Sequence, residues 1–289
     1  MTARSWIGGN SNDSLYTAAD WSPAGTLAPG DTLSMASGVA SLDGGNLAGD
    51  TLTIPANASA FQPYSATVNL SGHATLSALV SHTALVEQEA IFNVVGRATL
   101  HVREQANSLA STRVTENIAP YSVLKGTFVA DGHDPNVTVN GADATARFAN
   151  CGDSSIAGGV AVINADVVGT GSFTARPFSG IMFLHSVGAH QTVNSDGFDR
   201  ITIGRPDLFQ GLVNFTGGPT NMIDLLGITA DSYSYRNDVL SLYRGGQVVD
   251  SLRLHASTSQ FQVTESARGI SITGLPASQP AGSVILPQV

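Results

Sequence analysis

The chain has 289 residues, of which only 12% are charged, and its formal net charge is −9 at pH 7. Ordinary soluble domains carry about 25% charged residues, so the polar character here comes from Ser, Thr, Asn and Gly. The negative charge disfavours nucleic acid and anionic membranes as partners, because both would repel the chain overall. The single cysteine, Cys151, excludes an internal disulfide and a cysteine-built zinc site.

The first residues show no export signal. Residues 1–10 contain an arginine but no apolar core of a signal peptide. No run in the chain approaches the roughly 18 apolar residues of a membrane span, so we expect no transmembrane segment. The sequence leaves open whether a signal was removed, the protein leaves the cell by another route, or it stays inside.

Two short repeats predict a β-solenoid. Residues 30–33 (GDTL) recur at 49–52, 19 residues later, and the pattern G-x-A-T-L at residues 72–76 recurs at 96–100, 24 residues later. Both spacings fit one coil of a solenoid, in which short strands stack coil on coil at about 4.8 Å. We expect the matched residues to stack as ladders.

Short segments of alternating residues continue to the end of the chain, bounded by Gly, Asn, Asp or Pro. Residues 81–95 are the best helix candidate, but they end in a β-branched pair and read equally well as two strands. A β-sandwich or jelly roll competes with the solenoid. The repeats favour an all-β parallel β-helix, or β-solenoid.

The composition changes near residue 177, beyond which aromatic and large aliphatic residues become frequent. Gly245 and Gly246 between two alternating runs predict a two-residue hairpin. We therefore predict a solenoid body with an N-terminal cap over residues 1–176 and a C-terminal β-rich cap module over residues 177–274 that shares its core. Residues 275–289 are expected to form an extended tail, either an edge strand or an arm to a neighbouring chain.

Two groups of motifs resemble bacterial secreted β-helical surface proteins. Residues 5–10 (SWIGGN), 20–25 (DWSPAG) and 29–33 (PGDTL) are similar to the opening of autotransporter passengers and haemagglutinin-like adhesins. Segments within residues 209–242 (FQGL, IDL, YSY) are similar to modules near the C-terminus of such proteins. The resemblance implies a right-handed surface β-helix. The chain departs from these proteins in that none of its segments resembles their translocator barrel.

Calcium is considered at residues 44–52 (GGNLAGDTL), which approach the repeat of calcium-binding β-rolls. Leu47 stands where a third glycine is needed and Asp50 falls one residue late, so we do not favour a site here. Residues 131–136 (DGHDPN) hold the densest set of oxygen ligands, but they also suit a turn between strands, which we favour. No cofactor is expected, and a calcium-dependent adhesin module stays open as an alternative.

Paired carboxylates are the chemistry of glycan-cleaving β-helices. Three pairs have a suitable spacing: Glu87 with Glu89, Asp131 with Asp134, and Asp196 with Asp199. Residues i and i+2 of a strand face one side about 6–7 Å apart, so Glu87 and Glu89 could cooperate. We favour solvated carboxylates, and keep as an alternative a tailspike-like glycan-processing enzyme that uses Glu87, Glu89, Asp196 and Asp199.

The histidines lack a recognised metal-ligand spacing. They are scattered along the chain, at His73, His82, His101, His133, His185, His190 and His255. His185 and His190 could join Asp196 and Asp199 in a metal site, but exposed or hydrogen-bonded histidines are favoured. At Cys151 a small buried side chain is favoured over a nucleophile. We expect no catalytic, cofactor-binding or metal-ligating residues.

The leading hypothesis is a non-enzymatic bacterial protein with a structural or adhesive role, located outside the cell or on its surface. An uncapped solenoid end presents unpaired strand groups to which another chain can add. We therefore expect a homo-oligomer or fibre, with a cell-surface glycan as a further partner. Trp6 and Trp21 are expected to cap the first coil.

Overall fold

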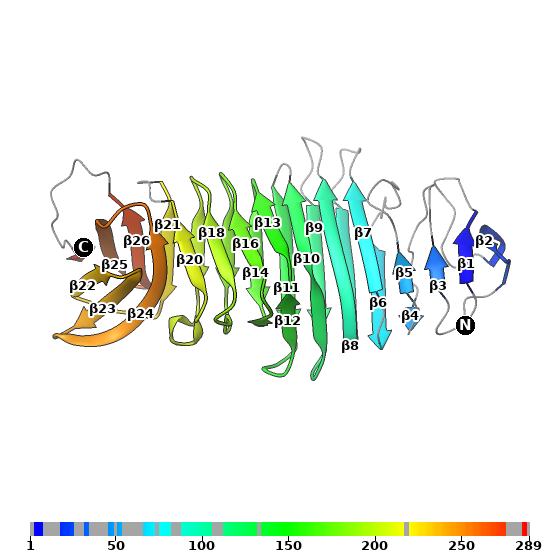
Figure 1. Ribbon diagram of the computed structural model, residues 1–289, viewed down its shortest axis with the longest axis horizontal. Helices are drawn as coiled ribbons and strands as arrows, with labels where there is room; N and C mark the ends of the chain where they lie inside the picture. Colours follow the sequence, from blue (N-terminus) through cyan, green and yellow to red (C-terminus); the bar gives the residue numbers. More distant parts are fainter. Residues whose placement is uncertain are drawn as a thin grey trace.

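The computed structural model confirms an all-β chain whose strands stack side by side along one long axis (Figure 1). The structure describes residues 3–7, 18–25, 32–34, 46–48, 51–53, 66–72, 75–81, 88–105, 112–131, 134–216, 220–275 and 285–287. A β-solenoid of about five turns spans residues 91–225, and an antiparallel region follows it. In the part of the chain that is described, no helix is long and apolar enough to cross a membrane.

Two sheets run along the axis, and the coils contribute strands to both. Sheet 1 contains β1 (Ala3–Trp6), β2 (Trp21–Ser22), β3 (Thr32–Ser34), β5 (Thr51–Thr53), β7 (Thr75–Ser81), the second half of β8 (Gln88–Gln105), β10 (Val123–Asp131), β12 (Arg147–Asn150), β13 (Asp153–Ala157), β15 (Asp166–Val168), β16 (Ser172–Ala175), β18 (Thr192–Ser195), β20 (Leu212–Phe215), β22 (Ser232–Arg236), β23 (Val239–Arg244) and β24 (Gln247–Ala256). Sheet 2 contains β4 (Asn46–Ala48), β6 (Ala66–Gly72), the first half of β8, β9 (Thr112–Ile118), β11 (Pro135–Gly141), β14 (Val160–Asn164), β17 (Gly180–Phe183), β19 (Arg200–Ile203), β21 (Met222–Leu226), β25 (Phe261–Ser266), β26 (Gly269–Gly274) and β27 (Ile285–Pro287). The short 3-10 helices are η1 (Ala18–Asp20) and η2 (Pro206–Leu208).

The sequence repeats mark neighbouring coils, as expected. The leucines that end them form one continuous column of register partners: Leu33, Leu52, Leu76 and Leu100. The threonines before them, Thr32, Thr51, Thr75 and Thr99, are aligned in the same way. The two repeats, read separately in the sequence, therefore belong to a single ladder in sheet 1.

In strands such as β10, β11 and β14, every second residue is buried in the core. In β10 the odd-numbered side chains are exposed or half-buried, and the even-numbered ones are buried. A column of phenylalanines fills the interior along the axis, with centroids of neighbouring rings 5.1 to 6.5 Å apart: Phe128, Phe148, Phe173, Phe183 and Phe209. Packing of these rings holds successive coils together.

The coil that follows β10 has an additional corner, because the single strand β10 is replaced there by two shorter strands, β12 and β13. Residues 123–126 of β10 pair with β12 and residues 129–131 with β13, so one strand faces two in the next coil. Gly126 lies opposite both Leu100 and Asn150. A Cβ atom at Gly126 would lie 1.7 Å from the Leu100 carbonyl oxygen, which explains why this position carries no side chain.

Parallel pairing of successive coils continues past residue 177 to β21, and the antiparallel pairs of the C-terminal region involve strands that follow β21. The structure thus places the change to antiparallel pairing later than the compositional shift suggested. The physical reason is that the aromatic residues beyond 177, such as Phe183, Phe209 and Phe215, fill the solenoid core.

The C-terminal region extends both sheets. β24 pairs with β20 in parallel and with β23 antiparallel, whereas β26 returns antiparallel on β21. The predicted hairpin is confirmed, since Arg244 pairs with Gln247 and both Gly245 and Gly246 have positive φ. β27, in the predicted tail, pairs with β25 of the same chain. At the other end β2 pairs antiparallel with β1, and Trp21 is fully buried; the side chain of Trp6 lies outside the description.

Candidate ligand-binding groove

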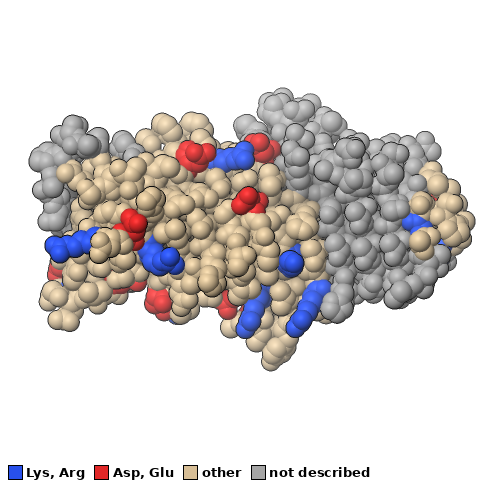
Figure 2. Space-filling view, in the orientation of Figure 1, with Lys and Arg blue, Asp and Glu red and all other residues tan. Residues whose placement is uncertain are grey.

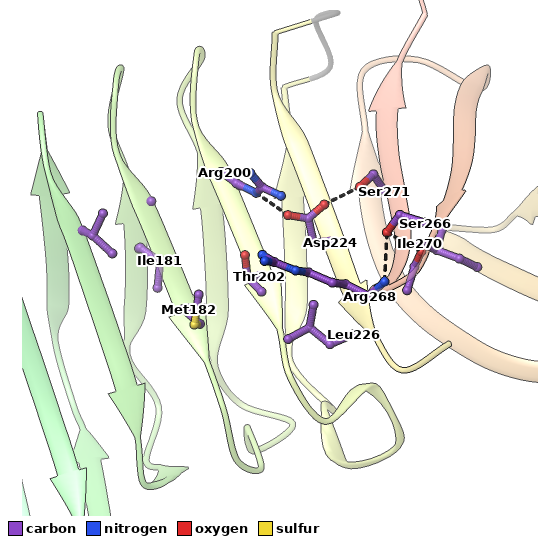
Figure 3. Close-up of a pocket in the computed structure, with 13 residues that line it drawn as sticks. Ile181, Met182, Arg200, Thr202, Asp224, Leu226, Ser266, Arg268, Ile270 and Ser271 are labelled. Atoms are coloured by element: carbon purple, nitrogen blue, oxygen red, sulfur yellow. Dashed lines mark hydrogen bonds and ion pairs between the residues drawn. The ribbon is translucent and has the colours of Figure 1, made fainter. Parts of the chain in front are cut away.

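A groove of about 310 Å³ lies on the outer face of sheet 2, where β14, β17, β19 and β21 meet the turn between β25 and β26 (Figure 3). Its lining includes Val160, Gly180, Arg200, Thr202, Asp224 and Arg268. The two arginines come from elements far apart in the sequence. The antiparallel return of β26 onto β21 brings them to one place.

Register builds the floor of the groove. Val160, Gly180 and Arg200 are successive partners in neighbouring coils. Because Gly180 has no side chain, a hollow is left between its two neighbours. A Cβ atom there would lie 3.6 Å from the Arg200 carbonyl oxygen and 3.9 Å from Val160 Cγ2, which are ordinary contact distances. The floor could therefore accept a side chain, and in this sequence it is left open.

Asp224 is the buried anchor of the groove. Arg200 Nε donates a hydrogen bond to Asp224 Oδ2, and Ser271 Oγ donates to Oδ1 at 2.5 Å. The Asp224 side chain is only 6% exposed, whereas that of Arg200 is 62% exposed. Both oxygens of Asp224 are thus engaged inside the protein, and Arg200 is held by its Nε with the remaining guanidinium nitrogens towards solvent.

Arg268 supplies a second guanidinium. Both polar groups of its backbone are hydrogen-bonded: the N–H donates to Ser266 Oγ at 3.2 Å, and the carbonyl accepts from the Gly227 N–H at 2.9 Å. The side chain extends from the turn across β21 towards Thr202 (Figure 3). Its guanidinium has no hydrogen bond or ion pair with any described residue. The lining of the groove therefore contains two arginines and one carboxylate, and the carboxylate of Asp224 is paired with Arg200. This local excess of positive charge lies on a chain whose net charge is −9.

An exposed aromatic pair lies next to the groove. Phe178 and Phe198 precede Gly180 and Arg200 by two residues, and their rings stack with centroids 5.5 Å apart. The Phe178 N–H donates to the Phe198 carbonyl at 2.9 Å, which extends the pairing of β17 and β19 to this corner. Phe178 is 76% exposed and Phe198 56% exposed. The site therefore combines cationic groups with an apolar aromatic surface.

Asp196 and Asp199, a predicted carboxylate pair, take different positions. Asp196 is exposed. Asp199 is buried and accepts hydrogen bonds from Ser195 Oγ at 2.7 and 3.0 Å and from the Gly197 N–H at 3.0 Å. Burial raises the pKa of Asp199, against the opposing effect of the Ser195 hydrogen bond. Asp199 thus holds the turn before β19.

The other predicted carboxylates are placed only in part. Asp131 and Asp134 are both exposed, and Asp134 has a φ of 54° at the turn between β10 and β11. Glu87 and the side chain of Glu89 lie outside the described residues. Of the segment considered for calcium, residues 44–52, the structure describes only the backbone of residues 46–48 and 51–52, in β4 and β5.

Two histidines have polar partners at the surface. His101 Nδ1 lies 3.1 Å from Thr127 Oγ1, and His255 Nδ1 lies 3.3 Å from Asp238 Oδ2. His185 is half-buried and His190 exposed. The remaining three lie outside the described ranges: His73, His82 and His133. Among described residues, no three His, Cys, Asp or Glu side chains gather in a group that could hold a metal ion.

The expectation of a buried Cys151 is wrong, because its side chain is exposed. Asn150 points inward instead. Its Nδ2 donates to the Ser172 carbonyl at 2.9 Å and to Gln191 Oε1 at 3.1 Å, so a polar side chain satisfies the backbone at this corner. The alternation of the strand thus continues up to Asn150 and leaves the next residue outside.

Sequence reasoning missed the groove and a column of asparagines. Six asparagines in sheet 2 are register partners in consecutive coils: Asn46, Asn69, Asn93, Asn117, Asn140 and Asn164. Their recurrence every 23 or 24 residues is a signal that the sequence contains. No comparable recurrence in the sequence marks Arg200, Asp224 or Arg268.

Comparison of the chain with protein-family models and with curated proteins gives no match. The fold and the geometry of the groove therefore carry the functional argument.

Proposed function

We propose that the chain forms a structural and adhesive part of a bacterial extracellular surface protein, related to β-helical adhesins, and that it catalyses no reaction. The observation that carries the proposal is the groove on sheet 2. It is an open binding surface built largely on strands of a long solenoid and not on loops, and sites on regular elements are held more rigidly than sites on loops. A surface glycan is the partner that suits an exposed groove with charged and polar side chains in its lining and an exposed aromatic pair close by.

Self-association into an oligomer or fibre belongs to the same proposal. β22 pairs only with β23 and β27 only with β25 among the described residues, so each has one free edge. A free edge can add a strand from another chain. Side-by-side packing is also supported by the face in Figure 2, because most of its described surface is uncharged.

The experiment has two readouts on the purified chain. Negative-stain electron microscopy and sedimentation would report assembly, and a printed array of bacterial and host glycans would report binding. Filaments or oligomers together with retention of defined glycans would support the proposal. Monomers at micromolar concentration that retain no glycan would contradict it.

A further inference from the structure

We infer that the groove binds a saccharide that carries a carboxylate, with the carboxylate held between Arg200 and Arg268 and a neighbouring sugar ring packed against Phe178 and Phe198. This inference rests on the proposed adhesive function, because it names the ligand class of the same site.

The guanidinium groups define the anionic part of the ligand. A guanidinium presents a planar fork of donors that matches the two oxygens of a carboxylate. Asp224 takes this role for Arg200 alone, since its oxygens accept from Arg200 Nε and Ser271 Oγ and form no hydrogen bond with Arg268. The Asp224 contact leaves the terminal nitrogens of Arg200 for a ligand, and the whole guanidinium of Arg268 is without a described partner.

The overall charge limits how many carboxylates the ligand carries. A chain with a net charge of −9 repels a dense polyanion, and the local excess in the groove is a single positive charge. The groove volume of about 310 Å³ lies at the small end of ligand sites, which span roughly 300–1,000 Å³. Both facts favour a saccharide with one carboxylate among neutral sugars, such as a terminal sialic acid or an isolated uronic acid.

The aromatic pair is an independent observation that points to the sugar. Phe178 and Phe198 have φ angles of 62° and 53°, a left-handed backbone that bulky side chains rarely adopt. The equivalent position of the preceding coil is Gly158, with a φ of 73°. Strained backbone and exposed phenyl rings in two successive coils are costly to keep, and such outliers concentrate at binding sites. The apolar face of a sugar ring packs well on an aromatic surface.

Distances allow one ligand to reach both parts. Phe178 and Phe198 stand two residues before Gly180 and Arg200, so their Cα atoms lie at most about 7 Å from those of Gly180 and Arg200. A disaccharide is long enough to span this step from the aromatic pair to Arg200. Gly180 lies on this path, and its missing side chain leaves room for the ring that carries the carboxylate.

The experiment is calorimetric titration at low ionic strength with sialyllactose, with an aldobiuronic acid, and with lactose as the neutral match. We expect at least one acidic saccharide to bind about tenfold or more tightly than lactose, because charge-assisted hydrogen bonds are strong. Arg268→Gln should weaken the acidic ligand at least about tenfold and leave lactose unchanged. Gly180→Val, which fills the floor, should weaken all the saccharides.

Matched variants separate binding from folding. Arg147→Gln removes an exposed arginine from sheet 1 and should leave every affinity unchanged. Phe178→Ser combined with Phe198→Ser should weaken the acidic and neutral saccharides alike, with an unchanged melting temperature, since both rings are exposed.

Three results would overturn the inference. The first is equal affinity of the wild-type chain for lactose and for the acidic saccharides, and the second is no binding of any acidic saccharide by the wild-type chain. The third is an Arg268→Gln variant that binds the acidic saccharide as tightly as the wild-type chain does. If the glycan array still retains the chain through neutral sugars, the adhesive function stands and only the ligand class fails. A preference between the two acidic saccharides identifies the source of the carboxylate.

Discussion

Glu116 lies in register with Phe92 of the neighbouring coil, so its carboxyl enters the interior of the solenoid at the level of a buried phenyl ring. Glu116 is 2% exposed, and its Oε2 has no hydrogen-bond partner among the described residues. Burial raises the pKa of Glu116 from 4.5 to about 8. The folded protein therefore holds this carboxyl in its neutral form through the acidic and neutral range.

The first prediction is a loss of stability with rising pH. Because the carboxyl binds its proton more tightly in the folded chain, the folded state carries the extra proton between pH 4.5 and about 8. The contribution to the free energy of unfolding is thus complete below pH 4.5 and falls until pH 8. Glu116→Gln should flatten this part of the profile in denaturant titrations at pH 5 and 8. An equal slope in wild type and variant would refute the assignment.

The second prediction concerns the asparagine column. Asn117 Nδ2 donates to Asn93 Oδ1 at 3.0 Å, and Asn117 Oδ1 accepts from Asn140 Nδ2 at 3.2 Å. Asn117→Ala removes both bonds and should lower the free energy of unfolding by about 1–3 kcal/mol. Thr115→Ala on the same outer face is the control, expected within about 0.5 kcal/mol of wild type. Equal effects of the two variants in urea titrations would count against a stabilising ladder.

The coil repeats could be predicted from the sequence because register partners in a solenoid recur at the coil length. Leu76 and Leu100 occupy equivalent places, and their flanking residues match as well. The same logic would have found the asparagines, had single residues been compared at that spacing. Periodicity thus determines the fold class, and it predicts which residues share a ladder.

The groove could not be predicted in this way. Arg268 reaches the neighbourhood of Asp224 because β26 pairs antiparallel with β21, and this pairing has no counterpart in the repeats. The corner at Asn150 could not be predicted for a related reason. The Asn150 side chain points inward because it binds Gln191, which lies two coils further along the chain. Contacts set by a change of topology or by a single corner leave no periodic trace.

The third prediction tests that corner. Gln191 Nε2 donates to the carbonyls of Asn150 and Val168, both at 3.0 Å, and Gln191 is fully buried. Gln191→Ala removes one hydrogen bond from each of these carbonyls and one from the Asn150 amide, and leaves a cavity in the interior, so it should cost about 2–4 kcal/mol. The exposed Gln210→Ala is the matched control and should change little. If calorimetry finds equal melting temperatures for the two variants, the network adds no stability.

The fourth prediction compares two glycines: Gly126, where backbone atoms leave no room for a side chain, and Gly180, where there is room for one. Gly126→Ala would bring a Cβ atom within 1.7 Å of the Leu100 carbonyl oxygen, which is backbone and can move only if the coils separate. We expect a loss of at least about 3 kcal/mol, at the upper end of overpacking effects. Gly180→Ala meets only ordinary contacts and replaces a flexible residue within a strand, so it should be neutral or stabilise by about 0.5–1 kcal/mol. Denaturant midpoints measure both. If the ranking of the two variants were reversed, the stacking of β10 on β8 would have to differ from the register in which Gly126 faces Leu100.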